Sequence, residues 1–359
     1  MMAGNLVLGF ILSASLNQLL TMINTMQLVV MLPLFKITVP ANAGMFFSQI
    51  MQIAAFDFFE TGPYIDALLG LPPSEPLNAN FEAVGFESLY LLHNMGTLFI
   101  AFVAYFTLVL LAFFCQYICC CERVKYFGEN LRKKLFFGSF IQIIFESYSI
   151  LAVSCFINLT RLSWSPFGEV LMSLTTIGFL ILLLAFPFGY GTYIWKNFNR
   201  FNVIEFFEKH SEFYKELNMR HGPMVLLQPI WFLVRRLVLA TIVVFLGQTA
   251  IWQIALMTLT VITQVIILGR VEPFVDKNKM YFEFFSETIV MLVMYTLICF
   301  TPFLPDLEMR FRLGYICIGI ISVHLLVSLF ILGKGIFKDV RFANSRWRSL
   351  KAHKAIRDA

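Results

Sequence analysis

Charged side chains are scarce in this sequence. Only 14% of the 359 residues are Asp, Glu, Lys or Arg, whereas 59% are hydrophobic and 41 are phenylalanine. So little polar surface cannot cover a water-soluble globule of this size, which predicts an integral membrane protein in contact with a lipid bilayer. In a membrane protein, the formal charge of +5 reflects how basic residues are distributed between the two sides of the membrane. It does not indicate a nucleic-acid-binding surface, and we expect no nucleic-acid partner.

Lysine and arginine are absent from residues 37–122. The first part of this stretch carries six acidic residues, namely Asp57, Glu60, Asp66, Glu75, Glu82 and Glu87. Basic residues beside membrane spans stay on the cytoplasmic side, so residues 36–93 are predicted to face outside. Helical periodicity after residue 45 predicts that this segment forms a small helical cap, either a packed loop or an acidic vestibule that concentrates cations.

The sequence patterns of common enzymes are also missing. There is no G-x-S-x-G elbow, no H-E-x-x-H pair and no glycine-rich phosphate loop, and the five histidines are scattered along the chain. We therefore expect no enzymatic activity and no cofactor, and we assign no metal site.

Continuous apolar runs make up most of the chain. A helix needs about 20 apolar residues to cross a bilayer. Eight runs meet this requirement: 6–35, 95–118, 135–157, 170–195, 226–246, 251–268, 284–304 and 313–332. The strands of a membrane β-barrel would instead alternate apolar and polar residues. The prediction is an all-α, polytopic membrane helix bundle of about eight transmembrane helices over residues 1–333.

Basic residues gather after every second predicted span. They follow the second, fourth and sixth spans, and they crowd the tail at 334–359. In an eight-helix alternation these segments share one side, which predicts cytoplasmic termini in the plasma membrane or an endomembrane. Residues 196–223, which mix aromatic and charged residues at helical spacing, are predicted to be a cytosolic amphipathic segment. The Pro187 turn before them predicts a kink or hinge.

Cysteine is absent from the predicted outer loops, so no disulfide framework is expected there. Cys115, Cys119, Cys120 and Cys121 instead gather at the cytoplasmic end of the second span, where S-palmitoylation, unmodified thiols and a zinc site are the alternatives. Four thiols at one helix end surround a zinc ion poorly. The sequon at Asn158 falls on the predicted outer side and is a glycosylation candidate.

Polar residues recur along the first span. Ser13, Asn17, Asn24 and Gln27 are spaced by four, seven and three residues, which places them on one helix face. Such a stripe can line an ion path through the membrane. It can equally form hydrogen bonds between helices, each worth about 0.6–2 kcal/mol.

Five charged residues inside the predicted spans or beside them stand out. Glu146 lies near the middle of the third span, Arg235 and Arg236 in the first half of the fifth, and Glu283 and Glu287 at the start of the seventh. Charged groups at this depth are costly and need partners.

Two interpretations of these charges remain open. One is an internal network in which Arg235 or Arg236 forms an ion pair with a carboxylate of the seventh span. The other is a cation-binding or proton-coupling site near the inner mouth, where Gln264 or Asn278 would add oxygen ligands. The two interpretations are compatible.

Short motifs spread over residues 16–333 carry a resemblance to a known membrane region. They are MINTMQ (22–27), LPL (32–34), VPAN (39–42), FDF (56–58), the Arg-Arg pair within 232–239, the stretch 264–273, EFFSE (283–287), ICFT (298–301) and RLGY (312–315). The chain resembles the C-terminal multi-span region of protist, especially ciliate, proteins with cysteine-rich repeat ectodomains. That region is similar to the transient-receptor-potential-like, fungal flavin-carrier-type membrane domain.

The resemblance implies a channel-like or transporter-like domain and assigns no catalytic residue. This chain lacks the repeat ectodomain, so we expect a short paralogue or the membrane portion of a larger protein. The resulting hypothesis is a channel-like, cation-conducting membrane protein that binds inorganic cations and forms a homo-oligomer or a complex with membrane partners. The alternative is a non-conducting membrane anchor or assembly subunit.

Overall fold

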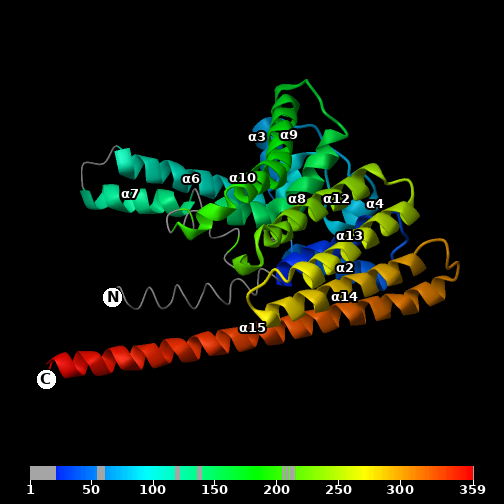
Figure 1. The fold of residues 1–359 in the computed structure, drawn as a ribbon. Helices are drawn as coiled ribbons and strands as arrows, with labels where there is room; N and C mark the ends of the chain where they lie inside the picture. Colours follow the sequence, from blue (N-terminus) through cyan, green and yellow to red (C-terminus); the bar gives the residue numbers. More distant parts are fainter. Residues whose placement is uncertain are drawn as a thin grey trace.

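The computed structural model describes residues 22–54, 61–117, 122–135, 140–203, 206, 210, 214 and 216–358 (Figure 1). Within these residues the chain is helical, and the one pairing of extended backbone is an isolated bridge between Leu217 and Phe274. The predicted all-α class is confirmed.

Seven helices in the described residues are long and apolar enough to cross a membrane. They are α6 (Thr97–Tyr117), α8 (Phe140–Leu159), the continuous helix Phe167–Lys196, Pro223–Phe245 with α12 (Leu227–Phe245), α13 (Ala250–Val271), α14 (Lys277–Cys299) and the Leu307–Lys338 part of α15 (Leu307–Asp358). The remaining predicted span, 6–35, is described only as the short apolar helix Met22–Leu34. The chain is therefore a polytopic integral membrane protein.

The spanning helices pack mainly against their neighbours in sequence. α12, α13, α14 and α15 lie side by side in that order, and α8 packs between α9 (Phe167–Ala185) and α12 (Figure 1). α6 and α7 (Glu122–Lys134) form a hairpin that projects from the bundle. Since consecutive helices run antiparallel, the α13–α14 turn and the start of α12 lie at the same end. We call this end, which holds Arg270, Lys277 and Lys279, the basic end.

Four short helices lie at the far end of the bundle: α2 (Ala41–Ala54), α3 (Gly62–Leu69), α4 (Ala79–Val84) and α5 (Leu91–Met95). The Asn78 side chain caps α4 by accepting hydrogen bonds from two backbone amides, and Gly85 ends the helix in the left-handed region that favours glycine. α2 lies along α15, and α5 packs on α8. Residues 36–93 therefore contain the predicted helices, while their extracellular side stays a prediction.

The helix Met22–Leu34 lies in the centre of the bundle. Val29, Val30, Met31 and Leu32 have no exposed surface and belong to a core shared with α8, α12 and α14. Lipid is as apolar as these side chains, so close packing holds this core together. An N-terminal segment thus supplies the inner wall of the helices that follow it.

One buried arginine closes the far end. Arg310 of α15 donates to the Leu304 carbonyl at 2.5 Å, to Thr38 Oγ1 at 2.8 Å and to the Thr301 carbonyl at 3.1 Å. The Thr38 backbone amide in turn donates to the Phe300 carbonyl at 3.2 Å. These bonds fasten the chain after Met22–Leu34 to the α14–α15 turn.

Two further helices differ from a regular membrane span, one by a π-helical turn and the other by its length. Pro187 lies in a single π-helical turn, η3 (Phe186–Tyr190), between α9 and α10 (Gly191–Lys196), so the predicted break is a local change of helical pitch. α15 continues for 52 residues, well past the part that contacts the bundle (Figure 1).

Candidate functional site

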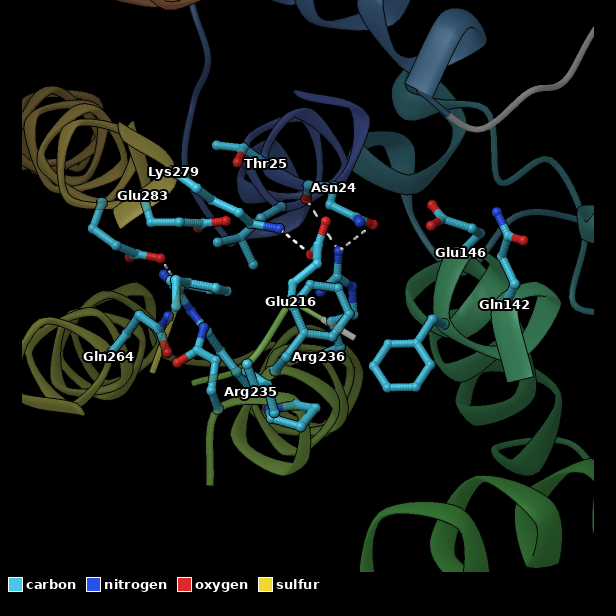
Figure 2. A pocket seen from close by; sticks show the side chains of 18 of the residues that line it. Asn24, Thr25, Gln142, Glu146, Glu216, Arg235, Arg236, Gln264, Lys279 and Glu283 are labelled. Carbon is cyan, nitrogen blue, oxygen red and sulfur yellow. Dashed lines mark hydrogen bonds and ion pairs between the residues drawn. The ribbon is translucent and has the colours of Figure 1, made fainter. Parts of the chain in front are cut away.

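A cavity of about 210 Å³ lies near the basic end of the bundle (Figure 2). The helix Met22–Leu34 and helices α8, α12, α13 and α14 form its walls, and residues 216, 217 and 274 contribute from the loops. Seven ionisable side chains line it: Glu146, Glu216, Glu283 and Glu287 are acidic, and Arg235, Arg236 and Lys279 are basic. The cavity therefore brings together all five charged residues that the sequence singled out within or beside the spans.

Arg235 of α12 is paired with Glu287 of α14. Arg235 Nη1 donates to Glu287 Oε1 at 2.5 Å, and the two side chains are only 7% and 8% exposed. The other polar atoms of this pair, Arg235 Nε and Nη2 and Glu287 Oε2, have no hydrogen-bond partner among the described residues. The same holds for Oε1 of Gln264, which lies beside Arg235 in Figure 2. Buried polar atoms of this kind need water or a ligand.

Arg236, the next residue of α12, points to the opposite side. Its Nε donates to Ser149 Oγ at 2.6 Å, its Nη2 donates to Asn24 Oδ1 at 3.0 Å, and its guanidinium lies 3.6 Å from the centre of the Phe232 ring. Asn24 separates Arg236 from Glu146, and the opposite charges act on each other across this amide (Figure 2). Asn24 and Glu146 therefore belong to the cavity wall.

The third charge pair was not predicted from the sequence. Lys279 Nζ pairs with Glu216 Oε2, and the ammonium lies 4.9 Å from the centre of the Phe274 ring. One signal was available, because Lys279, Glu283 and Glu287 follow one another at intervals of four residues and so share one face of α14. Glu216 gave no such signal, since its pairing depends on a loop.

Glu283 has no partner of its own. It lies between Lys279 and Glu287 on α14, but within the described part of the chain it forms no hydrogen bond and no ion pair. Its side chain is half-buried and lines the cavity. The cavity thus has four carboxylates and three basic side chains, and Glu283 is the carboxylate that no basic side chain contacts directly or across Asn24.

Gln27 does not share the position of Asn24. Gln27 is buried, and its Nε2 donates to the backbone carbonyl of Glu146 at 3.1 Å, which joins the first helix to α8. Gln27 therefore acts in helix packing, whereas Asn24 lines the cavity. Asn17 lies outside the described residues.

Beyond the cavity, toward the far end, a group of buried apolar side chains lies between the helices, together with a few buried polar ones such as Thr260 and Gln253. Past the cavity residues, the helix Met22–Leu34 and helices α12, α13 and α14 contribute side chains that are at most 1% exposed: Val30, Leu239, Val243, Val261, Val290 and Met294. We call this set the apolar layer. It separates the cavity from the far end in the structure described here.

The remaining predicted sites lie elsewhere. Asn158 is 2% exposed, its Nδ2 donates to the Leu89 carbonyl at 2.9 Å, and its Oδ1 accepts from Thr176 Oγ1 at 2.7 Å. Asn158 is therefore enclosed in the folded bundle, and its glycosylation stays a prediction. Cys115 is partly exposed near the end of α6, while Cys119, Cys120 and Cys121 lie outside the described residues, so palmitoylation stays a prediction.

We compared the chain with known protein families, curated proteins and solved structures. No protein family, no curated protein and no solved structure matches the chain. Among the described residues, no three His, Cys, Asp or Glu side chains are grouped as ligands for a metal ion. The cavity is therefore the feature from which a function can be inferred.

Proposed function

We propose that this membrane protein is channel-like and moves small cations through the cavity at its basic end. The observation that carries the proposal is Glu283, a carboxylate that lines the cavity without an ion-pair partner among the described residues, while two other carboxylates there have one. An unpaired carboxylate inside a membrane protein is costly unless water or a positive charge accompanies it. A cation entering from the basic end would supply that charge.

The closed part of the path is the apolar layer. Hydrophobic constrictions gate channels by excluding water, and small displacements of the lining helices are enough to wet them. Val30, Leu239 and Val290 come from three different helices, so movement of any one helix would widen the layer. The resemblance to channel-like protist membrane regions agrees with this arrangement.

Flux through reconstituted protein tests the proposal. Purified protein in liposomes should release potassium or sodium ions faster than empty liposomes. Glu283→Gln should lower this flux at least tenfold, because it removes the charge of this carboxylate while keeping the shape, and Glu283→Asp should keep most of it. Glu308→Gln is the matched control, since Glu308 is 74% exposed on α15 and far from the cavity.

The alternative is a non-conducting anchor or assembly subunit, which the apolar layer favours. Absence of flux from the wild-type protein, with Glu283→Gln equally stable, would leave this alternative as the better account. Equal flux from wild type and Glu283→Gln would instead show that ions take another route.

A further inference from the structure

A short extended segment lines the more exposed side of the cavity, which we call its mouth. Residues 216–218, which we call the strap, run antiparallel to the α13–α14 turn and form the bridge between Leu217 and Phe274. The Asn218 amide donates to the Pro273 carbonyl at 2.7 Å, and the Val275 amide donates to the Glu216 carbonyl at 3.1 Å. Leu217 and Phe274 both line the cavity, so the strap forms part of its wall.

A positive charge of the protein itself occupies this mouth. Lys279 lies between the Glu216 carboxylate on the strap and the face of the Phe274 ring. A carboxylate and an aromatic face are both attractive to a cation. One turn further along α14 comes Glu283, the carboxylate without a partner. The lysine therefore stands where an entering cation would first meet the cavity.

The contacts of the strap are weaker than those deeper in the cavity. The Lys279 and Glu216 side chains are 20% and 37% exposed, whereas Arg235 and Glu287 are nearly enclosed. A partly exposed ion pair contributes little to stability because water and salt screen it. Besides that pair, two backbone hydrogen bonds join the strap to the α13–α14 turn, and Leu217 packs with Phe274 and Leu268 in a small apolar cluster that is separate from the main core. Segments held this way open more readily than the core.

We infer that the strap and Lys279 form an inner gate, in which the Lys279 ammonium is a tethered competitor for the cation site at Glu283. The inference rests on the proposed function, because the site it regulates is the proposed cation site. Release of the strap withdraws Glu216 from Lys279, which frees the ammonium to leave the mouth. A solute cation then has access to Glu283.

Accessibility of position 283 tests the gate without any measurement of conduction. A Glu283→Cys variant in lipid nanodiscs is treated with a positively charged, water-soluble thiol reagent, and mass spectrometry of the peptide gives the rate at this position. Adding Lys279→Gln or Glu216→Gln should raise the rate about tenfold, since either removes the pair. Lys279→Arg, which keeps the pair, should leave it low.

A reversible cross-link supplies the converse experiment. Leu217 and Phe274 are bridge partners, and the Cα separation of such partners suits a disulfide. In a Leu217→Cys/Phe274→Cys background, oxidation should stop labelling at position 283 and reduction should restore it. Labelling that responds to neither the cross-link nor the loss of the Lys279–Glu216 pair would overturn the inference.

The matched control is another lysine over an aromatic ring. Lys334 Nζ lies 4.4 Å from the centre of the Phe330 ring on α15, away from the cavity, so Lys334→Gln should change neither labelling nor flux.

Measurements of ion flux distinguish the gate from the proposed conduction. Strap-dependent labelling without flux in any variant supports the gate and removes the conduction proposal, whereas flux that ignores the cross-link and Lys279→Gln supports conduction and removes the gate.

Discussion

The two ends of the bundle bury arginine in different ways. At the far end Arg310 donates from all three nitrogens, two of them to backbone carbonyls and one to a threonine hydroxyl. At the basic end Arg235 uses one nitrogen on Glu287, and its Nε and Nη2 have no partner among the described residues beside a cavity of about 210 Å³.

This contrast separates a structural arginine from one that belongs to a site. Each guanidinium nitrogen of Arg310 has a fixed acceptor, so this side chain serves to join two chain segments. Arg235 retains unused donors next to unused acceptors, an arrangement that costs free energy and that a purely structural role does not require. The difference predicts which substitutions affect stability and which affect transport.

Removing one member of the Arg235–Glu287 pair should have the largest effect on stability. Arg235→Leu or Glu287→Leu alone should cost about 3–5 kcal/mol, because each leaves a buried charge without its partner. The double variant should cost clearly less than the sum of the two. Unfolding of the four proteins in detergent measures this cycle, and simple additivity would show that the two residues do not interact.

Arg310→Leu should lower stability by about 3 kcal/mol through the loss of three charge-assisted hydrogen bonds. Arg310→Lys should recover little of it, because an ammonium cannot reach three acceptors arranged around a planar guanidinium. The protein that still folds should keep its full cation flux. Loss of flux with unchanged unfolding would contradict the division between the two ends.

Asn24 and Gln27 sharpen the comparison within one helix. Gln27→Leu should cost about 1 kcal/mol, the usual worth of a hydrogen bond between membrane helices, and should leave flux unchanged. Asn24→Leu should reduce flux, since it removes the amide between Arg236 and Glu146. Cysteine at position 24 should react with water-soluble thiol reagents, and cysteine at position 27 should not.

The smallest effect is expected at the exposed pair on α15. Arg312 and Glu308 are four residues apart and 71% and 74% exposed. Arg312→Ala should therefore change stability by about 0.5 kcal/mol or less and leave flux unchanged. A larger loss would mean that this surface is covered by another molecule.

Properties set by local sequence were predictable. The length of each apolar run fixed the seven spanning helices, because a bilayer requires about 20 apolar residues whatever the neighbours are. The chemistry of the cavity was also visible, since Glu146, Arg235, Arg236 and Glu287 are conspicuous in spans of this polarity. Their roles in transport stay predictions.

Pairings between helices were not predictable from spacing. Glu283 and Glu287 are one turn apart on the same face, and only the depth at which α12 meets α14 decides that Arg235 binds the second. Asn24 and Gln27 are less than one helical turn apart on the same face, yet they make different contacts. Asn24 accepts from Arg236 in the cavity, whereas Gln27 donates to the backbone of α8. Asn158 matched a glycosylation sequon, but the sequence could not show that Leu89 and Thr176 enclose it.

The length of α15 determines how far from the membrane a partner of the C-terminal residues would be bound. A helix rises 1.5 Å per residue, so the 20 residues from 339 to 358 extend roughly 30 Å beyond the part of α15 that qualifies as a membrane span. An uninterrupted helix of this kind is a rigid spacer. It would hold a bound partner at a fixed standoff from the lipid headgroups, and a tilt of α15 inside the bundle would swing that partner sideways by a distance that grows with its position along the rod.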